Sequence, residues 1–282
     1  MAFTPWRSLH SLPTAGFSLI ELSVVVAILS VVATLGLEVA ANFVNRSMNT
    51  LSRERLQQVD EATAAFFKVY GRLPCPADKT LSPVAPSNNG LENCALAVLT
   101  GTTVGGGLMA GAVPFRSLNL PMRSSLDAFG GKLHYVVTKN LTVAGSDAAG
   151  KFGYRLGTSA QNGVGGIEMR SGALEQPCST TKCQILANPA SNLGAAYILF
   201  SAGADQRGAV SARGVALKPC NVYASERRVD TQNCVFGDNA VRAGMIFSSI
   251  PYNVFYDNRL NAGLNLASYF DDIVVWRARA QL

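Results

Sequence analysis

The stretch that decides the fold of this chain reads Ala15-Gly16-Phe17-Ser18-Leu19-Ile20-Glu21 and runs directly into an apolar segment that extends to Leu37. Residues 17–41 would form a helix about 37 Å long, enough to cross a hydrocarbon core of about 30 Å. Glu21 would then place a carboxylate inside the membrane, where it is costly unless a partner neutralises it. An amine created by cutting after Gly16 would be such a partner, because Phe17 and Glu21 lie one helical turn apart.

These residues resemble the class III signal of type IV prepilins and of the pseudopilins of type II secretion. In those families a prepilin peptidase cuts after the glycine and methylates the new amino group, and a glutamate follows four residues downstream. The resemblance implies that Gly16 and Phe17 are processing residues and that Glu21 is an assembly residue. The alternative is an ordinary signal anchor that carries an isolated glutamate.

The chain is expected to have a helical stem and one head. The leader would be residues 1–16, the membrane-spanning or filament-core helix 17–41, its continuation against the head 42–70, and the head 71–282. Residues 38–70 contain no proline or glycine, and their apolar residues recur at helical spacing, so one helix should continue to Tyr70 before Gly71 and Pro74 end it. The apolar stripe that should pack on the head includes Leu51, Leu56, Val59, Phe66 and Tyr70, and the face expected to meet water or neighbouring subunits carries Arg53, Glu54, Asp60 and Glu61.

The head pattern predicts short strands separated by loops rich in Gly, Pro, Ser and Asn. We therefore predict an α+β, pilin-like fold in which a long N-terminal helix, membrane-spanning in its first half, packs on an antiparallel sheet with disulfide-stapled loops. The glycine-rich segments 101–111 and 163–166 do not follow a strand in a βαβ unit, so they do not predict phosphate loops. The expected strands are 133–138, 166–169, 196–201, 245–250 and 273–277.

All six cysteines follow the apolar segment, which indicates an oxidising compartment and disulfides. Many pairings are possible, and zinc is the main rival, although no Cys-x-x-Cys supports it. Sequential pairing would pin one loop in each case: Cys75 with Cys94, Cys178 with Cys183, and Cys220 with Cys234.

The orientation of the span rests on conflicting signals. Arg7 alone precedes it and Arg46, Arg53 and Arg55 follow it, so the positive-inside rule favours a cytoplasmic head. The cysteines and the cleavage motif favour the opposite orientation. We expect an inner-membrane single-pass protein with a periplasmic head, which later enters a pilus or pseudopilus.

Three head segments also resemble pseudopilins: 127–135 resembles their Asp-Pro-Trp-Gly turn, 201–205 their Ser-x-Gly-x-Asp turn, and 271–273 their terminal acidic pair. In that family the late acidic loop helps to bind calcium. Asp205, Asp271 and Asp272 could form such a site if their loops meet, although Asp is also a common turn residue.

The sequence offers little for catalysis. His134 is the only histidine after the leader, it lies in an expected strand, and no Gly-x-Ser-x-Gly is present. We expect a structural subunit rather than an enzyme. Its large, loop-rich head suits a minor subunit, whose partners would be the prepilin peptidase, other pilin or pseudopilin subunits and the inner-membrane assembly platform.

A tip-located role in adhesion or DNA capture is the alternative. Residues 71–282 carry 19 Lys or Arg against 13 Asp or Glu, a net charge of +6. This charge could attract DNA or an anionic surface, although a solvated basic face explains it as well. The densest basic stretch contains Arg207, Arg213, Lys218, Arg227 and Arg228.

Overall fold

The computed structural model describes residues 18–83, 88–99, 107–143, 165–172, 183–191, 193–220, 233–234, 254–258, 272–278 and 281–282. Within the helix it describes the backbone but not the side chains of residues 32–42. The chain forms two compact units, Met1–Arg46 and Ser47–Leu282.

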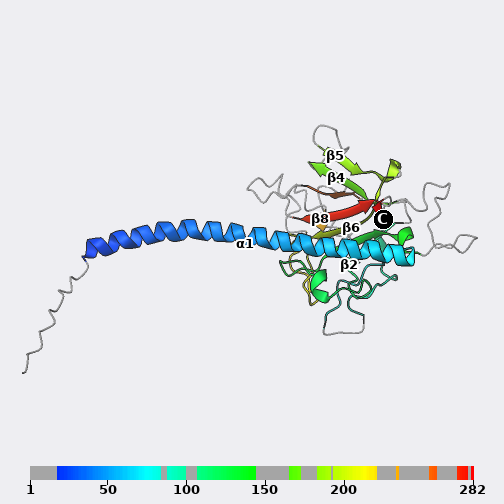
Figure 1. Cartoon of the computed structure of the whole chain (residues 1–282), viewed down its shortest axis with the longest axis horizontal. Helices are drawn as coiled ribbons and strands as arrows, with labels where there is room; N and C mark the ends of the chain where they lie inside the picture. The colour runs from blue at the N-terminus through cyan, green and yellow to red at the C-terminus, as the bar shows by residue number, and fades with distance from the viewer. Residues whose placement is uncertain are drawn as a thin grey trace, which may run out of the picture. The chain divides into compact units, whose positions relative to one another are not determined.

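One helix, α1, is continuous from Leu19 to Tyr70 (Figure 1). It begins after Ser18, whose side-chain oxygen accepts a hydrogen bond from the Ile20 amide at 3.3 Å. It ends at Gly71, which has a φ of 65° and donates its amide to the Phe67 carbonyl at 2.8 Å. Glycine adopts this left-handed conformation without strain and therefore ends helices. The predicted end at Tyr70 is confirmed.

In the first unit, the apolar side chains of α1 that the structure describes are exposed, from Leu19 at 87% to Val31 at 59%. Within the described part of the chain, no helix combines the length and the apolar character needed to cross a membrane.

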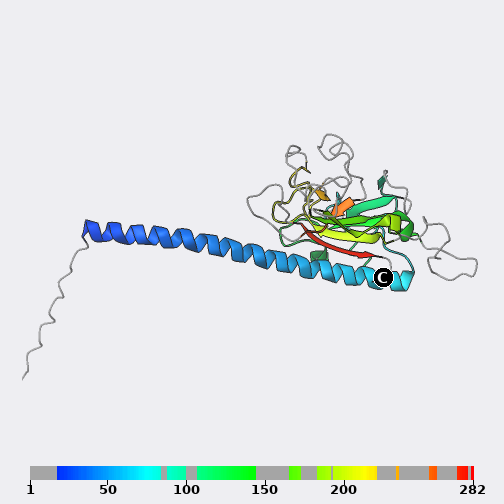
Figure 2. The same cartoon turned by 90° about the horizontal axis from the view of Figure 1, so that it is seen from above.

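The main sheet of the second unit has five strands, all antiparallel to their neighbours, in the order β1-β2-β3-β6-β8. The second part of α1 crosses one face of this sheet (Figures 1 and 2). This arrangement confirms the α+β class and the strands expected near 133–138, 196–201 and 273–277. The strands are β1 (Val98–Leu99), β2 (Leu108–Ala112), β3 (His134–Thr138), β6 (Ala195–Ser201) and β8 (Ile273–Ala278).

A second sheet has the order β5-β4-β7, with β5 at Cys183–Ala187, β4 at Glu168–Gly172 and β7 at Val254–Tyr256. β4 pairs antiparallel with β5 but parallel with β7, so the predicted antiparallel sheet is confirmed for the main sheet, whereas this second, mixed sheet was not predicted. A parallel partner comes from a distant part of the chain, which local patterning cannot show. The strand expected at 245–250 lies outside the described residues. The described residues also include three short 3-10 helices: η2 (Met122–Ser125), η3 (Lys139–Thr142) and η4 (Pro189–Ser191).

Two buried apolar clusters cover the two faces of the main sheet. Because side chains alternate along a strand, Tyr135 and Tyr197 join the cluster that includes Leu56 of α1, whereas Val136 and Ile198 join the cluster of the second sheet. The head is therefore layered as helix, main sheet and second sheet. The stripe of α1 that was expected to pack is partly wrong, because Leu51 is 40% and Tyr70 is 53% exposed. Among the α1 side chains that the structure describes, the buried ones are Ser52, Leu56, Val59, Asp60, Thr63, Ala64 and Phe66.

Candidate assembly site

Glu21 lies exposed in the first turn of α1. Ser18 precedes the helix and Glu21 stands three residues later, which is the spacing of a capping box. A carboxylate in this position also interacts favourably with the positive end of the helix dipole. Sequence reasoning missed Ser18, although the Ser-x-x-Glu spacing signals it. Gly16 and Phe17 lie outside the described residues, so the pairing of the Phe17 amine with Glu21 stays a prediction.

The side chains around Glu21 form an apolar surface. Leu19, Ile20 and Leu22 are 87%, 76% and 55% exposed, and the exposure continues along the helix to Val31. A contiguous apolar surface of this kind marks a site that another apolar body covers. Glu21 is a carboxylate within such a surface, so any body that covers it must also accommodate its charge.

Asp60 holds α1 against the main sheet. Its carboxylate accepts the Tyr197 hydroxyl at 2.6 Å and forms a bidentate ion pair with Arg277 of β8. Asp60 is 7% exposed, so the expectation that it faces water or another subunit was wrong. Burial, together with the Asp60 charge, raises the pKa of Tyr197. The hydroxyl therefore remains a donor, and the network joins the helix to two strands.

A second attachment joins α1 to the turn at residues 126–131. Arg55 Nη1 donates to the carbonyls of Leu126 and Asp127, both at 2.9 Å, and Ser52 Oγ accepts the Ala128 amide at 3.0 Å. Asp127 Oδ1 accepts the amide of Gly131 at 2.7 Å, and its Oδ2 accepts the Ser201 hydroxyl at 2.7 Å. The structure thus brings together the segments 127–135 and 201–205, which the sequence singled out separately.

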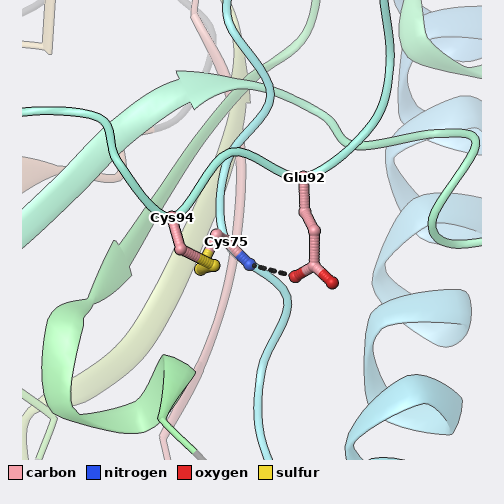
Figure 3. A group of neighbouring side chains, drawn as sticks. All are labelled: Cys75, Glu92 and Cys94. Carbon is pink, nitrogen blue, oxygen red and sulfur yellow. Dashed lines mark hydrogen bonds between the residues drawn. A yellow bond between two sulfur atoms is a disulfide. The ribbon is translucent and has the colours of Figure 1, made fainter. Parts of the chain in front are cut away.

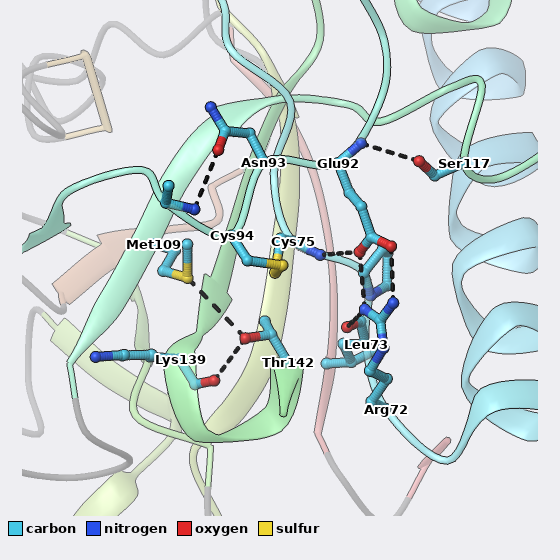
Figure 4. Close-up of a disulfide and its surroundings, with 12 residues drawn as sticks. Arg72, Leu73, Cys75, Glu92, Asn93, Cys94, Met109, Ser117, Lys139 and Thr142 are labelled. Atoms are coloured by element: carbon cyan, nitrogen blue, oxygen red, sulfur yellow. Dashed lines mark hydrogen bonds and ion pairs between the residues drawn. A yellow bond between two sulfur atoms is a disulfide. The ribbon is translucent and has the colours of Figure 1, made fainter. Parts of the chain in front are cut away.

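The end of α1 is attached through Glu92. This carboxylate accepts two hydrogen bonds from Arg72, both at 2.7 Å (Figure 4). It also accepts one from the Cys75 amide at 3.0 Å (Figures 3 and 4). Burial alone would raise the pKa of Glu92, but the bonds from Arg72 and Cys75 lower it. Glu92 is a structural residue that the sequence did not reveal, because its partner lies 20 positions away.

Two disulfides follow the sequential order expected. Cys75 is bonded to Cys94, and Cys220 is bonded to Cys234. The pair of Cys178 with Cys183 lies outside the described residues, since the first of these is not described. Cys75, Glu92 and Cys94 are the one group of His, Cys, Asp or Glu among the described residues that is close enough to hold a metal. Both sulfurs are consumed in the disulfide (Figure 3), so in this state they cannot be thiolate ligands.

The expected calcium residues have other contacts where they are described. Asp205 is paired with Arg207, with Oδ2 and Nε 2.9 Å apart, and Asp272 accepts Asn233 Nδ2 at 3.0 Å. Asp271 lies outside the described residues. The two described carboxylates do not belong to one group close enough to hold a metal, and the calcium site stays a prediction.

His134 and the basic stretch can also be placed. His134 stacks on Phe200 with ring centroids 4.7 Å apart, and burial together with the charge of Lys79 lowers its pKa to about 3. In the basic stretch, Arg207 is occupied by Asp205, whereas Arg213 and Lys218 are exposed. Arg227 and Arg228 lie outside the described residues.

Comparison with known families finds a match near the N-terminus of the chain. The model of the prokaryotic N-terminal methylation motif matches residues 13–37. No curated protein and no solved structure matches the chain. The match contains Gly16, Phe17, Glu21 and the exposed apolar part of α1. Residues 13–37 are therefore a prokaryotic N-terminal methylation motif, of the kind found in type IV prepilins and pseudopilins.

Proposed function

We propose that this chain is a pilin-like structural subunit that a prepilin peptidase cuts after Gly16 and methylates at Phe17. The mature chain then assembles, as a minor subunit, into a type IV pilus or a type II secretion pseudopilus. One observation carries this proposal: the methylation motif at residues 13–37 leads into the helix α1, whose described N-terminal apolar side chains are exposed.

Before assembly, the segment 17–41 lies in the inner membrane and the head lies in the periplasm. The apolar sequence of this segment supports a lipid environment. The two disulfides of the head support an oxidising compartment. During assembly the lipid around α1 is exchanged for the apolar stems of neighbouring subunits.

Glu21 sets the register of the assembled stems. Its carboxylate is costly in an apolar core unless the N-terminal amine of Phe17, from its own chain or a neighbouring chain, neutralises it. Breaking a buried ion pair by removing one partner costs about 3–5 kcal/mol. Stems that pack with Glu21 unpaired are therefore disfavoured, and this selects one insertion depth.

The head supports a minor role. Its segments 75–94 and 220–234 are closed by disulfides, and the short sheet β5-β4-β7 adds a third layer. A head of this bulk suits a subunit present in few copies better than one that must tile a whole filament. The prepilin peptidase, other pilin subunits and the assembly platform are its partners.

The test is the mass of the mature protein. In cells that contain the peptidase, the chain should lose 16 residues and gain one methyl group on Phe17. Gly16→Glu should instead leave a precursor about 1.6 kDa heavier, taking roughly 0.1 kDa for each leader residue. The neighbouring substitution Ala15→Ser keeps the glycine and should be processed normally. A wild-type chain that keeps its leader in the presence of the peptidase would contradict the proposal.

A further inference from the structure

A short hairpin covers residues 209–218. The Ser211 amide donates to the Val215 carbonyl at 2.8 Å, and the Leu217 amide donates to the Ala209 carbonyl at 2.9 Å. Gly214 forms the tip with a φ of 83°, and an added Cβ there would lie 2.0 Å from the Thr80 carbonyl oxygen. The hairpin is therefore a defined element held against the loop that contains Thr80.

The hairpin is attached beside the first turns of the part of α1 that belongs to the second unit. The Lys132 amide donates to the Val210 carbonyl at 2.7 Å, and Gly131 bridges to Ser211. This places the hairpin next to the 126–131 turn, which is bonded to Ser52 and Arg55 of α1. Both helix residues lie in the first turns of the second unit, which begins at Ser47. The hairpin thus lies at the end of the head nearest in sequence to the apolar segment.

The surface of the hairpin combines apolar and basic side chains. Val215 is 62% and Leu217 is 38% exposed, and Arg213 and Lys218 are exposed beside them. Apolar side chains flanked by cations suit a membrane interface, where the former enter the boundary of the acyl chains and the latter contact anionic headgroups.

We propose that the 209–218 hairpin rests on the anionic lipid surface while the subunit waits in the membrane. This inference rests on the membrane-anchored stem proposed above. Lipid fits the hairpin better than nucleic acid does. Arg207, the basic residue that precedes the hairpin, is already held by Asp205, and exposed Val215 and Leu217 gain nothing from a phosphate backbone.

The experiment uses the full mature chain reconstituted in vesicles of phosphatidylcholine, with or without phosphatidylglycerol. Hydrogen–deuterium exchange of residues 209–218 should be slower in the anionic vesicles, and added salt should remove the difference. Each basic residue near an anionic surface strengthens the attraction about fivefold. The double substitution Arg213→Gln and Lys218→Gln should therefore abolish the protection, and Val215→Ser with Leu217→Ser should weaken it.

Arg116→Gln provides a matched control. Arg116 is also exposed, but its amide is bonded to Gly90, in the loop that joins the other end of α1 through Glu92. This control should leave the protection unchanged, and exchange in β3 and β6 should report an intact head in every variant.

Three results would overturn the inference. In the first, the wild-type chain floats with both kinds of vesicle while residues 209–218 exchange equally fast in both. This result would contradict the hairpin contact but not the anchored stem. Protection produced by duplex DNA in neutral vesicles, without an effect of anionic lipid, assigns the hairpin to nucleic acid instead. A wild-type chain that floats with neither kind of vesicle would contradict both the anchored stem and the hairpin contact.

Discussion

Asp60 and Arg277, which are 217 positions apart, form a bidentate ion pair that joins α1 to the main sheet. Arg277 Nε lies 2.9 Å from both carboxylate oxygens, and its Nη2 lies 2.6 Å from Oδ2. The Tyr197 hydroxyl donates to the same carboxylate at 2.6 Å. The second half of the N-terminal helix is thus fastened to the last strand, and forces on the stem can reach the head through this contact.

Asp60→Ala should lower the free energy of unfolding by about 2–3 kcal/mol, because hydrogen bonds to a charged group are lost and the Tyr197 hydroxyl keeps no carboxylate partner. Urea unfolding in detergent, followed by the fluorescence of Trp276 beside Arg277, measures the loss. Glu54→Gln changes an exposed charge on the same helix and should cost less than about 0.5 kcal/mol. Equal effects of the two substitutions would show that the Asp60 network does not hold the helix.

Asp127 should tolerate the loss of its charge but not the loss of the side-chain oxygen that accepts the backbone amides. Burial raises the pKa of its carboxyl, while the hydrogen bonds from Ser201 and three backbone amides oppose the shift. Asp127→Asn keeps an oxygen for the amides and relieves a buried charge, so its midpoint of unfolding should lie close to the wild-type value. Asp127→Ala leaves those donors without a partner and should cost about 1–3 kcal/mol. A larger loss in Asp127→Asn than in Asp127→Ala would contradict this account.

His134 should make the head sensitive to acid. Its pKa is about 3 in the folded head against an ordinary value of 6.5, so below pH 6.5 the unfolded chain takes up a proton that the folded head refuses. The stability that neutral His134 supports is therefore present above pH 6.5 and is lost as the pH falls toward 3, with a slope of at most about 1.4 kcal/mol per pH unit.

His134→Phe keeps a ring against Phe200 and removes the titration. Its stability relative to the wild type should be constant above pH 7 and should rise on acidification. Thermal unfolding of both proteins across this pH range provides the comparison. A difference that does not change with pH would show that His134 titrates alike in the folded and unfolded chains.

The helix could be predicted because its signals are local. Helical spacing and Gly71 gave the end of α1, and runs of β-branched and aromatic residues gave β3, β6 and β8. β2 was missed because Gly111 and two alanines, which make up three of its five residues, are poor strand formers. The strand forms nevertheless, since it pairs with β3 along its whole length. Glycine is needed at position 111 because an added Cβ there would lie 2.2 Å from the Ala77 carbonyl oxygen.

The polar contacts could not be predicted because their partners are far apart in the sequence. Asp60 was interpreted as part of a solvated face, since a charged residue on a helix surface is usually exposed. Its burial depends on Tyr197 and Arg277, which only the folded sheet brings within reach. At the N-terminus the opposite holds: Gly16, Phe17 and Glu21 belong to one short local motif, their roles were inferred from its resemblance to the prepilin signal, and the family match covers the same residues.

The most direct test of the account is the incorporation of Glu21 variants into filaments, measured as the fraction of cleaved subunit recovered in the sheared filament fraction. Glu21→Ala and Glu21→Gln should be cut after Gly16 as in the wild type but should incorporate poorly. Ser18→Ala weakens only the helix cap, by about 1 kcal/mol, and should incorporate nearly normally. Normal incorporation of Glu21→Ala would contradict the claim that this carboxylate pairs with the Phe17 amine during assembly.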